Sequence, residues 1–158
     1  MDEEIVNLNV GDDAPNFSGL DQNGKTISNR NMTGERYILY FYPKDDTPGC
    51  TTQACDFRDN LQIFSKRGLK VIGISKDDAE SHKRFIKKYD LTFPLLIDQD
   101  LKIHKMFGVW REKKNYGKTY MGVSRSTFVI DEKGKIEWLG YNVRAKGHVD
   151  KLIKELKI

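Results

Sequence analysis

The sequence predicts an α/β fold, a single layered domain spanning residues 1–158 in which helices flank a central mixed sheet. Apolar runs typical of buried strands alternate with segments whose apolar residues recur at helical spacing. This alternating part reads strand, helix, strand, helix, strand, and a hairpin and a final helix follow it. A chain of 158 residues is long enough to bury one sizeable core.

The first part of the chain is expected to be an arm, residues 1–15, followed by a hairpin. Asn23-Gly24 is a strong signal for a tight turn between antiparallel strands. The run Tyr37–Phe41 is continuously apolar and aromatic, which is typical of a central strand buried on both faces. The elements expected here are strands at Phe17–Leu20 and Lys25–Ser28, a turn or short helix at Asn31–Arg36, and the strand at Tyr37–Phe41.

The middle of the chain is expected to alternate helices with buried strands. Phe57, Leu61 and Phe64 recur at helical spacing, and Gly68 is a typical helix stop. Either Asp77 or Asp78 can cap the next helix. The expected elements are a helix from Cys50 to Lys66, a strand at Lys70–Ser75, a helix from the capping aspartate to Tyr89, and a strand at Phe93–Ile97.

The last part is expected to close the sheet. Asp131-Glu132-Lys133-Gly134 separates two apolar runs, as in a hairpin. The expected elements are a short helix at Asp100–Phe107, a long loop with room for local structure at Gly108–Gly122, strands at Ser126–Ile130 and Ile136–Tyr141, and a helix at His148–Lys157.

The chemistry is expected where the strand Tyr37–Phe41 gives way to the following helix. Pro48-Gly49 marks a tight turn that places Cys50 in the first helical turn, and Thr47 can cap the helix or hydrogen-bond a molecule that approaches the sulfur. A thiol there lies among unpaired backbone N–H groups at the positive end of the helix dipole, which favours thiolate over thiol. Cys55 is the only other cysteine.

The two cysteines do not by themselves establish redox chemistry. A cysteine is commonly a small buried apolar residue with no chemical role. The C-x4-C spacing does not suit a structural zinc site, which needs four ligands at shorter spacing, nor a thioredoxin-type C-x-x-C motif.

The run Pro43-x-x-x-Thr47-x-x-Cys50 resembles the peroxidatic-cysteine motif of the peroxiredoxins. With Cys55 following, the chain resembles the peroxiredoxin Q subfamily, also called bacterioferritin comigratory protein. The resemblance extends over nearly the whole chain, through Gly11–Phe17, Phe107–Trp110, Gly117–Tyr120 and Arg125–Asp131. It implies a thioredoxin-like fold of the peroxiredoxin type, with the N-terminal β-hairpin as an addition.

The same resemblance implies the function and the role of each site residue. The protein would be a thiol-dependent peroxidase for hydrogen peroxide and organic hydroperoxides, recycled by thioredoxin or a similar dithiol reductant. Cys50 would become a sulfenic acid, and Cys55 would resolve it as an intramolecular disulfide. Thr47 and Arg125 would supply hydrogen-bond donors and positive charge, which the displaced oxygen needs. Pro43 would shape the loop and shield the thiolate from water.

Two features of the segment conflict with a simple version of this chemistry. Five residues along an α-helix rise about 7.5 Å and rotate about 140°, whereas a disulfide needs Cα atoms roughly 4.4–6.8 Å apart. We therefore expect Cys50–Cys55 to unwind locally during catalysis. The carboxylates of Asp45 and Asp46 would oppose a thiolate, so we expect both to point outward, and we expect Arg58 to form a structural ion pair.

The composition indicates a solvated surface rather than a nucleic-acid or membrane partner. The formal net charge is +4, but the lysines at 102, 105, 113, 114 and 118 are interleaved with acids and match no nucleic-acid motif. No apolar run approaches the ~18 residues of a membrane helix. The acidic segment Met1–Glu4 lacks the order of a secretory signal, so we expect a cytoplasmic protein, and a monomer.

His82, His104 and His148 do not cluster with either cysteine in the sequence. We expect each on the surface or in a helix, with no catalytic or metal role, and we expect no cofactor. Two further functions stay open: a redox switch that uses the same cysteine pair but turns over poorly, and a disulfide reductase, against which the absence of C-x-x-C argues.

Overall fold

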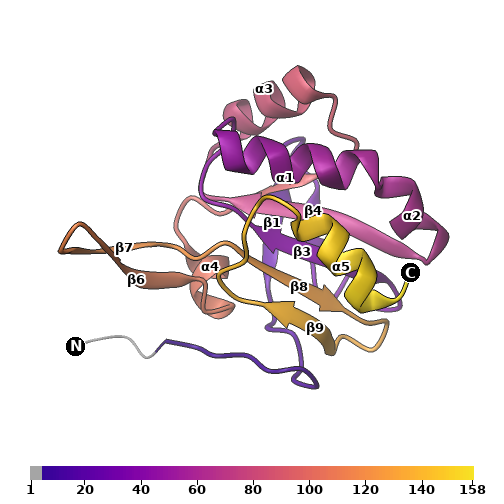
Figure 1. Ribbon diagram of the computed structural model, residues 1–158. Helices are drawn as coiled ribbons and strands as arrows, with labels where there is room; N and C mark the ends of the chain where they lie inside the picture. The colour runs from indigo at the N-terminus through magenta and orange to yellow at the C-terminus, as the bar shows by residue number, and fades with distance from the viewer. Residues whose placement is uncertain (1–4) are drawn as a thin grey trace.

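The computed structural model describes residues 5–158, and the acidic segment Met1–Glu4 lies outside the described residues. Within the described part, seven strands form one mixed sheet in the order β2-β1-β5-β4-β3-β8-β9 (Figure 1). Their bounds are β1 Ser18–Asp21, β2 Thr26–Ser28, β3 Arg36–Phe41, β4 Leu69–Ser75, β5 Leu95–Ile97, β8 Ser126–Ile130 and β9 Ile136–Gly140.

Strand β3 lies near the middle of the sheet and is buried over its last five residues. It pairs in parallel with β4 and antiparallel with β8, and β5 continues the parallel part beyond β4. The hairpin β1–β2 adds to the far edge, because β1 pairs antiparallel with β5. The predicted mixed sheet and N-terminal hairpin are therefore confirmed.

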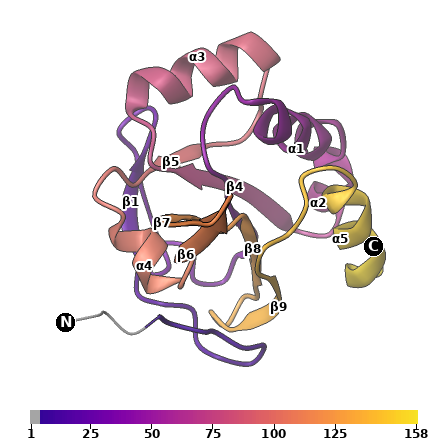
Figure 2. The same cartoon turned by 60° about the vertical axis from the view of Figure 1, so that its left-hand side comes forward.

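Helices cover both faces of this sheet. Their bounds are α1 Pro48–Asp59, α2 Leu61–Lys66, α3 Ala79–Tyr89, α4 Lys102–Met106 and α5 His148–Leu156. Figure 2 shows α1, α2 and α5 on one side of the sheet and α4 on the other. The alternating side chains of β3 explain these layers: Ile38 and Tyr40 pack in one cluster with α1, α2, α3 and α5, while Leu39 and Phe41 pack in a second cluster with α4.

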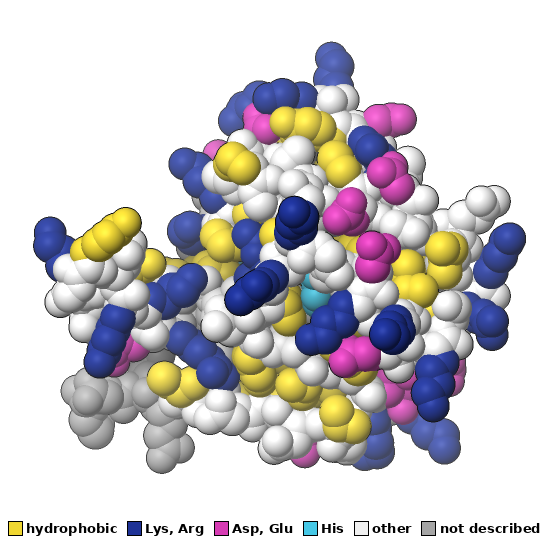
Figure 3. Space-filling model, viewed as in Figure 1, with side chains coloured by type: hydrophobic (Ala, Val, Ile, Leu, Met, Phe, Trp, Pro, Cys, Tyr) yellow, Lys and Arg dark blue, Asp and Glu magenta, His cyan; other side chains and the backbone are white. Residues whose placement is uncertain are grey.

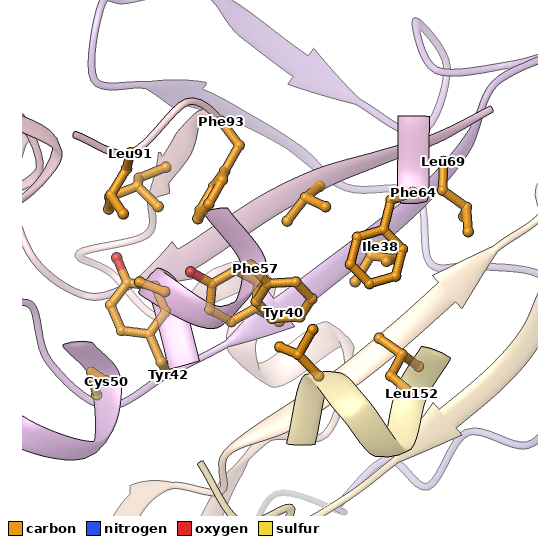
Figure 4. Packing of buried hydrophobic residues seen from close by; sticks show 14 of the residues in the cluster. Ile38, Tyr40, Tyr42, Cys50, Phe57, Phe64, Leu69, Leu91, Phe93 and Leu152 are labelled. Carbon is orange, nitrogen blue, oxygen red and sulfur yellow. The ribbon is translucent and has the colours of Figure 1, made fainter. Parts of the chain in front are cut away.

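The first cluster also reaches the reactive segment. Tyr40 stacks on Phe57 of α1, with ring centroids 4.5 Å apart. Figure 4 shows Cys50 at the edge of this cluster, beside Tyr42. The helix that carries Cys50 is therefore held by its buried aromatic face, mainly downstream of the cysteine itself.

The single helix predicted from Cys50 to Lys66 is wrong, because the structure divides it at Asn60 into α1 and α2. Asn60 leaves the helical region at φ −107° and ψ 8°. Its side-chain amide donates to the carbonyl of Asp56 at 2.8 Å. Asparagine competes in this way with the helical hydrogen bonds of the backbone.

The strand predicted at Phe93–Ile97 begins only at Leu95. Pro94 has no N–H to donate to a strand partner, but its carbonyl accepts from the backbone N–H of Gly73 at 3.1 Å. The other helices and strands agree with the predicted bounds to within two residues, and Asp78 caps α3 by accepting from the N–H of Ser81.

The long loop predicted at Gly108–Gly122, with room for local structure, is instead an antiparallel hairpin of β6 Trp110–Asn115 and β7 Lys118–Val123. The turn residues Tyr116 and Gly117 both have positive φ, 52° and 76°, as in a type I′ turn. The hairpin projects from the body of the molecule (Figures 1 and 2). Because most of its side chains are exposed on both faces, the sequence lacks the apolar alternation that would have predicted strands.

The charged surface is mixed in sign. Figure 3 shows lysine and arginine side chains interleaved with aspartate and glutamate over one face of the molecule. Over residues 5–158, the structure contains no helix that is both long and apolar enough to span a membrane.

Candidate active site

The site is built at the end of β3, where the chain turns through residues 42–47 into α1. Thr47 is the N-cap of α1 and Pro48 is its first residue, where a missing N–H costs nothing. Cys50 therefore lies in the first turn. The amide groups of Gly49 and Cys50 precede Thr51, whose N–H makes the first helical bond, to Thr47 at 2.8 Å, so they remain available to a ligand.

Cys50 and Arg125 are 75 positions apart in the sequence, but their side chains are in contact. Arg125 Nη2 lies 3.4 Å from Cys50 Sγ, within hydrogen-bond distance for sulfur. Cys50 is 1% exposed and Arg125 is half-buried. Arg125 lies one residue before β8, and its carbonyl accepts from the N–H of Val143 at 2.8 Å. The guanidinium also packs closely on the glycine before the cysteine, since a Cβ on Gly49 would lie 3.3 Å from Nη2, a tight contact that would require a shift of a few tenths of an ångström.

Gln53, one helical turn after Cys50, is a site residue that sequence reasoning missed. Its Oε1 accepts from Arg125 Nη1 at 2.7 Å, so Arg125 bridges the sulfur and this amide. Gln53 is fully buried, and its Nε2 has no hydrogen-bond partner among the described residues. The i, i+3 spacing from Cys50 on one helix face could have indicated it.

Thr47 and Pro43 lie in the loop that leads to the sulfur, both half-buried. The Thr47 side chain does not cap α1, contrary to one of its two expected uses. Its hydroxyl instead donates to the carbonyl of Lys44 at 2.9 Å, which leaves the oxygen lone pairs free to accept. Pro43 presents its carbonyl to Lys76 Nζ at 3.2 Å.

Cys55 lies in the same continuous helix as Cys50, and both are free thiols. Cys50 is buried and Cys55 is half-buried. Residues five apart in an α-helix point in different directions, so the helical arrangement keeps the two sulfurs apart.

The expectation that both loop aspartates point outward is wrong for Asp45. Asp46 is exposed and accepts from Lys88 Nζ and Tyr89 Oη, each at 2.8 Å. Asp45 is 7% exposed and turns inward, with Oδ2 2.7 Å from Nδ1 of His82. An inward carboxylate is tolerated here because a buried imidazole and several donors face it. Arg58 forms the expected ion pair, with Asp59.

The histidines lie in helices as expected, but none lies on the surface: His82 and His104 are 0% exposed and His148 is 3% exposed. Each is buried because a specific partner accepts or donates to its ring: Asp45, Asp98 and Thr127, respectively. Burial, together with nearby Lys151 and Arg125, lowers the pKa of His148 to about 4. His148 is therefore neutral at physiological pH.

The chain is similar to known proteins over nearly its whole length. Residues 10–139 match the AhpC/TSA family model. The chain is 51% identical over 155 residues to a Mycobacterium tuberculosis protein assigned to the peroxiredoxins, covering 98% of this chain and 99% of that one. It is 45% identical over 150 residues to peroxiredoxin Bcp of Escherichia coli, covering 95% and 96%. The chain belongs to the peroxiredoxins, in the AhpC/TSA family.

Solved peroxiredoxin structures have the same fold. A mutant of peroxiredoxin Q from Xylella fastidiosa superposes with a TM-score of 0.89 at 33% identity, covering 96% of this chain and 97% of that one. The bacterioferritin comigratory protein of Xanthomonas campestris, a protein described by its alkyl peroxide reduction activity, gives 0.84 at 37% identity, covering 89% and 90%. The predicted thioredoxin-like fold of the peroxiredoxin type is thereby confirmed.

Two other features of this peroxiredoxin could attract a ligand. A cavity of about 470 Å³ lies between β2, the start of β4 and residues 92–94, but neither cysteine nor Arg125 lines it. Asp45, Asp77 and His82 each offer a possible metal ligand atom within 4.8 Å of the others. The side chains of Asp45 and His82 already bond to each other, and Asp77 accepts from the backbone N–H of Asp45 and from the Ser75 hydroxyl, so a metal ion would have to replace those hydrogen bonds.

Proposed function

We propose that this peroxiredoxin reduces hydrogen peroxide and organic hydroperoxides at Cys50, and that Cys55 resolves the oxidised product. The observation that carries the proposal is the guanidinium of Arg125, 3.4 Å from a buried sulfur in the first turn of α1. A permanent positive charge and free backbone N–H groups favour thiolate, the nucleophilic form of cysteine.

In the first step, the Cys50 thiolate attacks the nearer oxygen of the peroxide. The S–O bond forms as the O–O bond breaks, sulfur is oxidised to sulfenic acid, and the departing alkoxide or hydroxide takes up a proton to give alcohol or water. Arg125 and the free N–H groups of α1 stabilise the negative oxygen, and the Thr47 hydroxyl oxygen, whose hydrogen is donated to Lys44, accepts from the O–H of the peroxide. Gln53 holds the guanidinium in this position through its 2.7 Å hydrogen bond. Pro43 shields the sulfur from water.

In the second step, Cys55 attacks the sulfenic sulfur, so a disulfide forms and water leaves. The first turns of α1 must unwind for this, because a helical i, i+5 pair is too far apart to bond. Opening is local, since Ala54 and Phe57 anchor the later turns in the core.

In the third step, an external dithiol reduces the disulfide and restores both thiols, becoming a disulfide itself. Thioredoxin or a similar protein fits this role, because unwinding exposes the Cys50–Cys55 bond to a protein-sized reductant. We place this cycle in the cytoplasm, where dithiol reductants are maintained, and propose a monomer that uses residues 1–158 as one domain.

The test is a peroxidase assay with a thioredoxin system on wild type, Cys50→Ser and Cys55→Ser. Cys50→Ser should consume no peroxide. Cys55→Ser should complete one turnover at the wild-type rate and then accumulate sulfenic acid or over-oxidised cysteine, detected by mass spectrometry. Equal loss of the first turnover in both variants would contradict the assigned roles.

The same assay separates the redox-switch alternative. Both functions produce a Cys50–Cys55 disulfide, so stoichiometric oxidation does not distinguish them. Sustained peroxide consumption with a recycling reductant supports the enzyme, whereas a single equivalent followed by no further consumption indicates a switch.

A further inference from the structure

A buried acid–histidine pair lies beneath the loop that carries the site. Asp45 belongs to the segment between Pro43 and Thr47, and His82 lies in the second turn of α3. Their side chains are 3% and 0% exposed, and Oδ2 of Asp45 lies 2.7 Å from Nδ1 of His82. Neither residue contacts the sulfur through any hydrogen bond of the described chain, and the proposed reaction does not use them.

The hydrogen bonds of this pair define where its proton lies. Nε2 of His82 is 2.8 Å from the carbonyl oxygen of Leu96, which can only accept, so Nε2 carries a hydrogen. Nδ1 faces a carboxylate that also accepts from Ser81 Oγ at 2.8 Å and from Tyr42 Oη at 2.6 Å. A lone pair on Nδ1 would be repelled by that carboxylate, so the arrangement requires a proton between them.

The charges around His82 agree with this assignment. Burial disfavours the imidazolium, but the hydrogen bond to Asp45 and its negative charge, with smaller contributions from Leu96 and Asp77, leave the pKa of His82 raised. Burial and the neighbouring Asp45 also raise the pKa of Tyr42 well above its usual value, so Tyr42 remains a donor. The groups facing the pair are therefore Asp77, Tyr42, Ser81 and the Leu96 carbonyl.

The pair links Asp45, the middle residue of the loop 43–47, to α3. The backbone N–H of Asp45 donates to Asp77 Oδ2 at 2.9 Å, so both its backbone and its side chain are held. The next residue, Asp46, adopts the left-handed conformation at φ 58°, which aspartate tolerates better than most residues with a side chain. A second, exposed contact joins Asp46 to Lys88 and Tyr89 of the same helix. The loop is thus held in shape from α3.

We propose that protonated His82 and Asp45 form a positioning pair that holds residues 43–47, and with them Thr47 and the start of α1, in the conformation that attacks peroxide. This inference rests on the proposed function for its kinetic consequence. When His82 loses a proton, the ring keeps a single N–H for two acceptors, the Asp45 carboxylate and the Leu96 carbonyl, so one of its two hydrogen bonds is lost and its hold on the loop weakens. A loosened loop favours the unwound segment in which Cys55 reaches Cys50. The protonated pair thus favours the conformation for peroxide attack, and the deprotonated pair favours the conformation for disulfide formation.

The sign of the pH dependence follows from the raised pKa of His82. With the segment folded, His82 binds its proton more tightly than at its ordinary pKa of 6.5. The contribution to the folded loop is fully present below about pH 6.5 and is lost as pH rises through the raised value. Peroxide attack should therefore show a decline at alkaline pH that coincides with His82 deprotonation, while disulfide formation becomes faster over the same range.

The test measures both steps by stopped-flow tryptophan fluorescence from about pH 6 to 10. His82→Gln should slow attack about tenfold at neutral pH, the loss expected for a buried hydrogen bond to a charged group, and should remove the alkaline decline. The double variant Asp45→Asn with His82→Gln pairs two amides, so it should recover part of the attack rate with no decline. Asp46→Asn, which alters the exposed contact on the same loop, should keep the decline.

An unchanged alkaline decline in His82→Gln would overturn the proposal. Nuclear magnetic resonance of the wild type gives a second test that needs no buried substitution and no peroxide. The His82 ring and the amides of Asp45 and Thr47 should titrate together, and independent titration would also overturn the pairing. If the wild type consumes no peroxide while these signals titrate together, the proposed function fails and the loop contact stands.

Discussion

Arg125 brings a permanent positive charge to a buried sulfur. Its two terminal nitrogens have separate tasks, since Nη1 binds Gln53 at 2.7 Å and Nη2 faces Cys50 Sγ at 3.4 Å. The planar guanidinium makes this division possible, because a lysine ammonium could not hold both partners in one fixed geometry. The amide of Gln53 therefore fixes the direction from which positive charge reaches the sulfur.

Replacing Arg125 with alanine should lower the rate of peroxide attack about 100-fold, the usual cost of removing one donor from a developing oxyanion. The fold should be retained, because Arg125 is half-buried and contributes to neither core cluster. Stopped-flow fluorescence measures the rate and circular dichroism the fold. Arg84→Ala, an exposed arginine on α3, is the matched control, and a wild-type attack rate in Arg125→Ala would remove this residue from the site.

At the level of elements, α1 must satisfy two opposed requirements. Its first turn has to be formed for Cys50 to face Arg125, and it has to open for Cys50 to meet Cys55. The core holds its later turns through Ala54 and Phe57, whereas Thr51 and Thr52 have modest helix propensity. The break at Asn60 separates α1 from α2, so unwinding need not be transmitted along one long helix.

Substitutions at exposed Thr52 should therefore alter disulfide formation through helix propensity. Thr52→Ala and Thr52→Gly both lose the hydroxyl bond to the Pro48 carbonyl, so their comparison isolates the backbone. Glycine is about 1 kcal/mol less favourable in a helix, so the Gly variant should form the disulfide about fivefold faster than the Ala variant after one equivalent of peroxide. The same pair of substitutions at Lys83 of α3 should show no difference. Equal rates at Thr52 would mean that unwinding does not limit this step.

At the scale of the whole molecule, two buried histidines give global stability opposite dependences on pH. His82 has a raised pKa, so its contribution is present below about pH 6.5 and is lost as pH rises through the raised value. His148 has a pKa lowered to about 4, chiefly by burial. Between the ordinary pKa of 6.5 and about 4, the unfolded chain binds a proton at this position and the native protein does not, so stability falls as pH falls.

Urea unfolding should therefore show a loss of up to about 3 kcal/mol between pH 6.5 and 4 from His148 alone. His148→Gln keeps a group that can bond to Thr127 but cannot titrate, so it should lose less stability than wild type over this interval. Burial raises the pKa of Asp98, but hydrogen bonds from His104 and Ile103 to its carboxylate outweigh burial and leave that pKa lowered. The stability that Asp98 contributes is therefore lost only at still lower pH. The same loss in the variant and in wild type would exclude His148 as the cause.

Much of this architecture could be predicted from local patterns. The apolar runs at Tyr37–Phe41 and Lys70–Ser75 became the buried central strands, because a strand covered on both faces has to be apolar along its whole length. The Asn-Gly turn predicted the first hairpin, and the Pro48-Gly49 turn predicted a helix that starts just before Cys50. The hairpin β6–β7 could not be predicted in the same way, because its exposed strands bury no alternating face.

The sequence by itself determined where the two cysteines lie along one helix, because capping, turn chemistry and helical spacing act between near neighbours. Only the tertiary structure decided which distant groups surround them. Arg125 reaches the sulfur from another strand, Gln53 turns toward that arginine, and Asp45 points inward because His82 is already buried there. The direction of a polar side chain depends on partners far away in the chain, and those partners exist only once the sheet and its helices have packed.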